Sequence, residues 1–177
     1  RWLPRLATGE LRGCLSLSEA DAGSDTRNIA CRATRDGDEY VINGTKFWVT
    51  NGERAGLIAL AVRTDEGVSC LMVEKDPGPS SGGLTVSKNI PKLGYKGIET
   101  VEMFYSDHRV GADCVLGGDD GLGHGLGFIL GALEVGRINI AARAVGVARA
   151  AFEAAIRYAQ DVHTFGKPVA ELPAIQQ

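Results

Sequence analysis

The sequence predicts an α+β protein in which an antiparallel, barrel-like β-domain is followed by one long helix. Short runs of alternating apolar and polar residues, separated by turn residues, fill the chain from residue 13 to about 116. A glycine-rich stretch follows at 117–127, and no proline occurs between Pro91 and Pro168. We therefore expect three parts, with boundaries at 1–12, 13–116 and 117–177.

Turn residues and apolar alternation define the expected strands. Asp36-Gly37 is a turn signal, and Asn43-Gly44 is typical of a β-hairpin. Leu57–Val62 is an almost entirely apolar run, as expected for a strand that is covered on both faces. Further strands are expected near residues 29–33, 40–42, 47–50, 68–74, 84–88 and 99–105.

The helical segments differ in length and in what they need for stability. Residues 1–12 carry apolar side chains at helical spacing but are too short to stand alone. From about residue 126 to 162, Ile129, Leu133, Ile140 and Val147 recur at the same spacing on one long helix. Such a stripe needs a partner, so we expect association of subunits. Because the chain begins with Arg1 and not with Met, we expect it to be an internal piece of a longer protein.

Composition excludes several classes of function. The 19 basic and 22 acidic residues give a net charge of −3 without a basic run, which argues against a nucleic-acid-binding protein. No stretch of about 18 apolar residues is free of charge, so no membrane span is expected. The four cysteines show no CxxC spacing and the three histidines are scattered, so we expect no metal site. Reduced thiols of this kind predict a cytoplasmic protein.

Two segments carry side chains that suit a ligand. Leu15–Asp25 is a turn rich in small residues, and such a turn presents backbone N–H groups and hydroxyl donors to an anion or a polar heterocycle. Phe47–Gly52 places the flat face of Trp48 beside the Thr50 hydroxyl. The alternatives are an ordinary solvent loop for the first segment and a core position for Trp48.

Five segments together resemble the acyl-CoA dehydrogenase family: LSEADAGSD (17–25), DGDEYVINGTKFWVTNG (36–52), KLGYKGIETVEMFYSDHRV (92–110), LEVGRINIAARAVGVARAAFEAAIRYA (133–159) and TFGKP (164–168). Their order and spacing agree with the family over nearly the whole chain. The resemblance implies that residues 1–12 end an N-terminal helical domain and that residues 13–116 form the middle β-domain. Residues 117–177 would then begin a C-terminal helical bundle, through which the family forms dimers or tetramers.

The resemblance also implies a reaction and a set of binding residues. The family oxidises an acyl-CoA thioester to a trans-2-enoyl-CoA: a glutamate removes the α-proton, and the β-hydrogen leaves as a hydride to FAD. An electron-transfer flavoprotein is the expected electron acceptor. Glu134 and Arg137 would contact the CoA portion together with Ser24, although a surface ion pair is the alternative for the two helix residues. The residues expected to bind FAD are Leu15, Ser16, Leu17, Ser18, Gly23, Ser24, Trp48, Val49, Thr50, Thr164 and Phe165.

The sequence departs from the family pattern at functional positions. Gly136 stands immediately before Arg137, where a subset of the family carries its catalytic glutamate, and Val162 replaces an arginine that reaches the FAD of a neighbouring subunit. Leu172 and Pro173 replace a His-Gln pair. We therefore expect no catalytic base within these 177 residues, and we expect the isolated chain to be inactive. An acyl-CoA oxidase, a flavin monooxygenase and a non-catalytic, dimerising β-barrel stay open as alternatives.

Overall fold

The computed structural model describes residues 1–176 and divides the chain into two compact units. The first unit is Arg1–Leu130 and the second is Gly131–Gln177. The division falls inside the long helix α2 (Gly125–Asp161), which lies one residue from the predicted range. The domain boundaries at 12 and 116 stay predictions.

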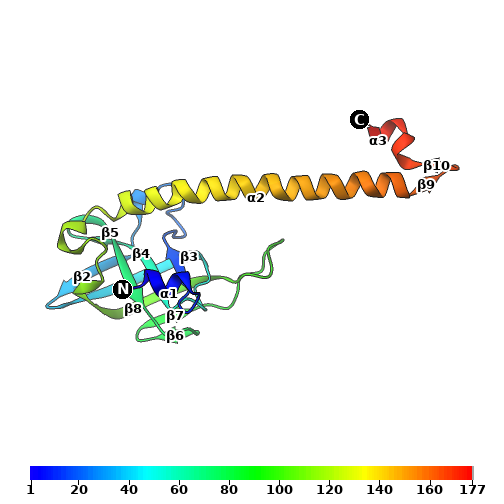
Figure 1. Ribbon diagram of the computed structural model, residues 1–177. Helices are drawn as coiled ribbons and strands as arrows, with labels where there is room; N and C mark the ends of the chain where they lie inside the picture. Colours follow the sequence, from blue (N-terminus) through cyan, green and yellow to red (C-terminus); the bar gives the residue numbers. More distant parts are fainter. Residues whose placement is uncertain (177) are drawn as a thin grey trace. The chain divides into compact units, whose positions relative to one another are not determined.

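The first unit is built on a sheet of eight strands, of which seven follow one continuous order and the eighth, β5, pairs with β4 (Figure 1). The order of the strands along the sheet is β1-β4-β2-β3-β8-β7-β6. A short helix, α1 (Leu3–Ala7), precedes the sheet. The strands are β1 (Gly13–Ser16), β2 (Arg32–Asp36), β3 (Glu39–Thr50), β4 (Leu57–Thr64), β5 (Gly67–Glu74), β6 (Ser80–Ser81), β7 (Leu84–Val86) and β8 (Thr100–Gly111).

The predicted class, a barrel-like β-domain followed by a long helix, is confirmed, and the sheet is a mixed half-barrel. Most neighbouring strands are antiparallel as expected, but β1 and β2 both pair with β4 in parallel. Tight turns impose antiparallel pairing only on strands that follow each other directly. Both β1 and β2 reach β4 through longer connections, so the turn signals in the sequence carry no information about their direction.

The strand predicted to be covered on both faces is β4. Leu57, Ile58, Leu60, Ala61 and Val62 are each at most 2% exposed. β5 pairs with β4 along its full length on one edge, and β1 and β2 share the other edge. This central position explains why the apolar run shows no alternation.

The two predicted turns have different outcomes. Asp36-Gly37 joins β2 to β3, and Gly37 has a positive φ of 63°, as a tight turn requires. The hairpin predicted at Asn43-Gly44 is wrong, because both residues lie inside the continuous strand β3. The pairing with β8 shifts register there, and Asn43 exchanges two hydrogen bonds with Asp107, at 3.0 and 2.9 Å. The Asn43-Gly44 dipeptide therefore lies at a β-bulge in the pairing of β3 with β8. The backbone at a β-bulge needs the same conformational freedom as the backbone of a turn.

The first turns of α2 pack against β5 within the first unit. A Cβ atom added to Gly125 would lie 2.2 Å from the backbone nitrogen of Cys70, so only glycine allows this approach. Ile129 is 3% exposed and fixes the next turn. The helix therefore starts from a fixed point on the sheet.

The second unit contains the rest of α2, β9 (His163–Thr164), β10 (Lys167–Pro168) and α3 (Pro173–Gln176). Its helix exposes large apolar side chains, among them Val135, Ile138, Ile140, Val147 and Phe152. By length and apolar composition α2 is sufficient to cross a membrane, which differs from the sequence-based expectation. The same composition is typical of a helix covered by other helices in a bundle.

Candidate functional site

The serine-bearing segment lies in a loop that projects from the edge of β4. Ser16 in β1 pairs with Leu60, and Arg32 in β2 pairs with Arg63, so both strands use the same edge of β4. The intervening loop, residues 17–31, spans only three residues of β4. Its length forces it away from the sheet, and it would be mobile without further contacts.

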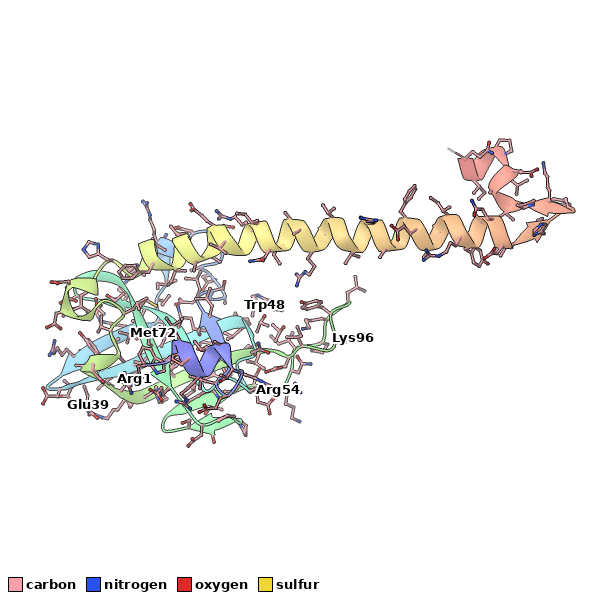
Figure 2. The ribbon with its side chains drawn as sticks, viewed as in Figure 1. Arg1, Glu39, Trp48, Arg54, Met72 and Lys96 are labelled. Carbon is pink, nitrogen blue, oxygen red and sulfur yellow. The ribbon has the colours of Figure 1, made fainter. Side chains whose placement is uncertain are left out.

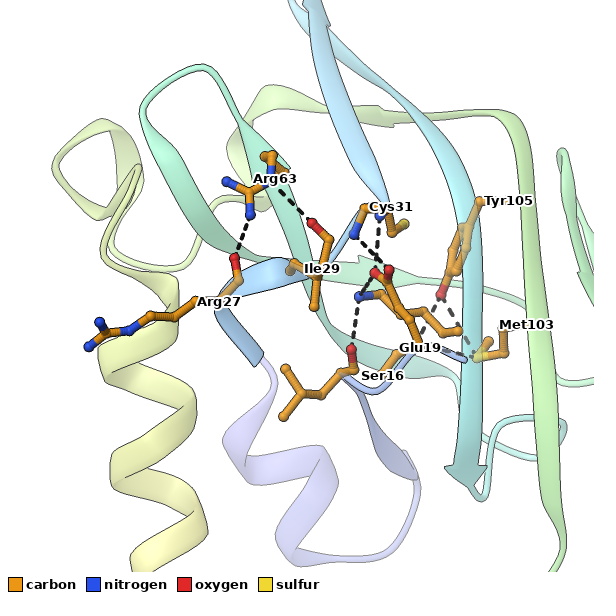
Figure 3. A network of polar contacts seen from close by, with 11 residues as sticks. Ser16, Glu19, Arg27, Ile29, Cys31, Arg63, Met103 and Tyr105 are labelled. Atoms are coloured by element: carbon orange, nitrogen blue, oxygen red, sulfur yellow. Dashed lines mark hydrogen bonds and ion pairs between the residues drawn. The ribbon is translucent and has the colours of Figure 1, made fainter. Parts of the chain in front are cut away.

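The Glu19 carboxylate fastens this loop at both ends (Figure 3). It accepts hydrogen bonds from the backbone N–H groups of Ala30, at 2.6 Å, and Cys31, at 3.0 Å. It also pairs with the Lys46 ammonium at 2.7 Å. The Arg63 guanidinium holds the far side of the loop by donating to the carbonyl of Ile29 at 3.1 Å.

Lys46 is the most deeply buried ionisable residue of this network. Its side chain is 0% exposed, and its ammonium donates to the Leu17 carbonyl at 2.9 Å as well as to Glu19. Burial lowers the pKa of Lys46, and the hydrogen bond to Glu19 opposes this. Burial by itself would raise the pKa of Glu19, but its hydrogen bonds from Lys46 and from two backbone N–H groups outweigh it and lower that pKa. Loss of either partner would leave a buried charge uncompensated.

A second β-bulge determines the orientation of Trp48. Lys46 pairs with Met103 and Val49 with Val101, so β3 advances three residues while β8 advances two. The extra residue places Lys46 and Val49 inward, although strict alternation would have put Trp48 on the inner face with Lys46. The indole is 60% exposed, and its backbone has a φ of 59° (Figure 2). The alternative that places Trp48 in the core is therefore wrong.

The two predicted binding segments lie side by side. The Phe47 N–H donates to the Ser18 carbonyl at 2.8 Å, which joins the loop to β3 directly beside Trp48. Within residues 1–176, the hydroxyls of Ser18 and Thr50 have no hydrogen-bond partner in the protein. Ser18, Trp48 and Thr50 form what we call the indole surface, which combines an exposed aromatic side chain with unengaged hydroxyl donors. Left-handed backbone at a non-glycine residue often marks a functional site.

Other predicted residues near this surface differ in what they can offer a ligand. The Ser16 hydroxyl is fully buried, 3.5 Å from the Tyr105 hydroxyl, and Val49 is 1% exposed in the core. Leu17 is 8% exposed, whereas Leu15 is 36% exposed. Ser16, Leu17 and Val49 would therefore meet a ligand mainly through backbone atoms. Gly23 and Ser24 are exposed in the outer part of the loop.

The remaining predicted residues belong to the second unit. Glu134 and Arg137 are both exposed on α2, and in the described part of the chain they form no ion pair with each other. Thr164 and Phe165 stand at the turn between β9 and β10, where Phe165 is 92% exposed and has a φ of 55°. These side chains are all accessible, and their binding roles stay predictions.

Three other features of the described residues bear on where a ligand could bind. A cavity of about 770 Å³ lies in the first unit between residues 5–12 and 54–81, but its lining mixes charges of both signs and includes none of the predicted binding residues. Among residues 1–176 no cluster of three His, Cys, Asp or Glu side chains could hold a metal ion. Burial raises the pKa of the Cys31 and Cys70 thiols to about 11, so neither is a reactive thiolate.

Glu19 and Lys46 are the two residues that sequence reasoning missed. Each lies inside a segment already singled out, and their opposite charges were the available signal. Only the tertiary structure shows that β3 aims Lys46 inward at the base of the loop.

Comparison with known proteins identifies the family of this chain. The family model described as "Acyl-CoA dehydrogenase, middle domain" matches residues 14–108 of this chain, and the model described as "Acyl-CoA dehydrogenase, C-terminal domain" matches residues 123–177. The chain belongs to the acyl-CoA dehydrogenase family. The middle-domain match covers nearly all of the sheet and the whole indole surface, which agrees with the resemblance seen in the sequence.

Curated relatives share about a third of their residues with the chain. It is 37% identical over 181 residues to the short-chain specific acyl-CoA dehydrogenase of Bos taurus mitochondria, covering 99% of this chain and 42% of that protein. It is also 37% identical to (2S)-methylsuccinyl-CoA dehydrogenase from Cereibacter sphaeroides, covering 98% of this chain and 33% of the relative. The chain therefore spans less than half of either relative.

Solved structures of the family share the fold. An acyl-CoA dehydrogenase from Geobacillus kaustophilus superposes with a TM-score of 0.91 at 35% identity, covering 99% of this chain and 46% of that one. A glutaryl-CoA dehydrogenase from Mycobacterium smegmatis in complex with FADH2 gives a TM-score of 0.90 at 35% identity, covering 99% and 43%.

Proposed function

We propose that this chain is the flavin- and substrate-binding part of an FAD-dependent enzyme that dehydrogenates an acyl-CoA thioester to a trans-2-enoyl-CoA. Family membership supports an oxidoreductase acting on acyl-CoA, and a relative of similar fold has been solved with FADH2. The observation that carries the proposal is the hydrogen bond between Phe47 and Ser18, which brings the serine-bearing loop to the exposed Trp48.

The donor set of the indole surface fits a flavin. An isoalloxazine ring has wide apolar faces and an edge rich in hydrogen-bond acceptors. Trp48 offers an aromatic face for the ring, and the Ser18 and Thr50 hydroxyls offer donors for its edge. FAD, when bound, would accept the hydride that leaves the substrate.

Of the other predicted binding residues, some would contact the cofactor and others the acyl-CoA thioester. Leu15, Ser16, Leu17, Gly23 and Val49 would line the cofactor mainly through backbone and apolar contacts, and Ser24 would serve a phosphate or the CoA portion. Thr164 and Phe165 would also serve as cofactor-binding residues. Exposed Glu134 and Arg137 on α2 are free to bind the polar CoA chain.

The catalytic base would come from outside these residues. Gly136 occupies the helix position before Arg137 and has no side chain that could accept a proton. The catalytic unit would accordingly be a larger protein, assembled as a dimer or tetramer, with an electron-transfer flavoprotein as its electron acceptor and the cytoplasm as its location.

Anaerobic titration of the complete, purified protein tests this proposal. We expect bound FAD with its visible absorption, bleaching of that band on addition of an acyl-CoA, and formation of the enoyl-CoA product. A panel of short-chain, dicarboxylic and long-chain thioesters would identify the acyl group. A protein that takes up no FAD would overturn the proposal and favour a dimerising β-barrel without catalysis.

An acyl-CoA oxidase or a flavin monooxygenase on the same fold is distinguished by oxygen. A dehydrogenase should react slowly with oxygen after reduction by substrate, and its turnover should depend on an added electron acceptor. Rapid peroxide formation would indicate the oxidase.

A further inference from the structure

The buried lysine at the base of the 17–31 loop, Lys46, contacts the residue that precedes Ser18 of the indole surface. Lys46 is fully buried, and its ammonium donates to the Leu17 carbonyl at 2.9 Å and to Glu19 at 2.7 Å. A single buried cation thus contacts both a backbone oxygen of the loop and the carboxylate that fastens the loop. Neither group belongs to the surface where a ligand would bind.

The hydrogen bond from Lys46 to the Leu17 carbonyl also determines the direction of the Ser18 N–H group. The Leu17–Ser18 peptide is trans, and in a planar trans peptide the C=O and the following N–H point in opposite directions. Because the Leu17 carbonyl points inward at Lys46, the Ser18 N–H points away from the buried ammonium. Within residues 1–176 this N–H has no hydrogen-bond partner in the protein.

The next peptide is fixed as well. The Ser18 carbonyl accepts from the Phe47 N–H at 2.8 Å, and the Glu19 N–H bonds to the Ala22 carbonyl at 3.1 Å. With bonded groups on both sides, the Ser18 N–H has little freedom to turn inward. It stands beside Trp48 as a preorganised donor.

We infer that Lys46, held in place by Glu19, is a positioning residue that aims the Ser18 N–H at the acceptor-rich edge of the flavin ring. This inference rests on the proposed function. Lys46 does not contact the cofactor itself; it acts through the orientation of one peptide. A donor at that edge favours the reduced ring, because reduction adds electron density to the ring, so loss of Lys46 should also lower the flavin reduction potential.

Lys75 provides a matched control in the same sheet. It is 7% exposed, and its ammonium donates to the carbonyls of Glu53 and Asp76, each at 3.0 Å, and of Gly78 at 3.4 Å. It is therefore another buried lysine that binds backbone oxygens, but the segments that it holds are not part of the indole surface. Lys46→Met and Lys75→Met each remove a buried ammonium group that donates hydrogen bonds to backbone carbonyls, one at the base of the 17–31 loop and one away from the indole surface.

The experiment measures the FAD dissociation constant, the flavin absorption spectrum and the midpoint potential of the complete protein and its variants. We expect Lys46→Met to raise the dissociation constant roughly tenfold, the loss of one well-placed hydrogen bond, and to shift the spectrum and lower the potential. Lys75→Met should leave all three close to the wild-type values.

A double variant covers the case in which Lys46→Met does not fold because Glu19 is left as an unpaired buried charge. Lys46→Met combined with Glu19→Gln removes both charges and should show the same flavin changes. Glu19→Gln alone keeps the bond from Lys46 to Leu17 and should change the flavin less.

The outcomes separate the inference from the function on which it rests. A wild-type protein without affinity for FAD would overturn both. Wild-type binding together with equal flavin properties in the Lys46 and Lys75 variants would overturn only the positioning role of Lys46.

Discussion

The exposed indole of Trp48 makes a quantitative prediction for cofactor affinity. Trp48→Ala keeps the left-handed backbone at this position but removes the aromatic face from the indole surface. An indole side chain has on the order of 250 Å² of surface, so an exposed fraction of 60% leaves about 150 Å² accessible. A stacked ring would cover about half of that, and about 75 Å² at ~25 cal/mol per Å² corresponds to roughly 2 kcal/mol.

This energy corresponds to a rise of roughly 25-fold in the FAD dissociation constant, measured by fluorescence titration of the complete apoprotein. Leu93→Ala is the control, because Leu93 is a fully exposed apolar residue of the same unit, on the loop whose Lys96 is labelled in Figure 2, and it lies outside the indole surface. A Trp48→Ala protein that binds FAD within about twofold of the wild type would refute the stacking role of the indole.

Three further predictions address stability, substrate binding and pH. In calorimetry, Gly44→Ala should lower the unfolding temperature much more than Gly37→Ala. Both glycines have a positive φ, but a Cβ added at Gly44 would lie 2.6 Å from the Cys31 Cα, whereas a Cβ added at Gly37 meets open space. The expected losses of folding free energy are therefore roughly 3–6 kcal/mol for Gly44→Ala and 1–2 kcal/mol for Gly37→Ala. Equal shifts would contradict the close approach. Arg137→Ala should raise KM for acyl-CoA about tenfold with FAD content unchanged, and an unaltered KM would show that this exposed side chain does not bind substrate. The lowered pKa of Glu19 stabilises the fold above the usual value of 4.5, and this contribution is lost as pH falls through the lower folded value. Glu19→Gln should therefore make thermal stability less dependent on pH below about 4.5 than in the wild type, and parallel profiles would argue against the buried pair.

The candidate site was predictable in its location and not in its construction. The serine-bearing segment and the FWVT segment stand out in the sequence because hydroxyl and aromatic residues suit a polar heterocycle. Which atoms face outward depends on contacts between residues far apart in the chain. Lys46 and Glu19 are 27 positions apart, and their pairing requires the loop and β3 to be folded together.

The sequence by itself determined the elements whose signals are local. The Asp36-Gly37 turn, the doubly covered strand from Leu57 and the long helix α2 follow from backbone preferences and apolar periodicity within a short window. Only the tertiary structure decided the parallel pairing of β1 and β2 with β4 and the two bulges in the pairing of β3 with β8. Strand register depends on which strand lies alongside, and a shift of one residue moves a side chain to the other face. One such shift places Trp48 outside and Lys46 inside, although both belong to the same short segment.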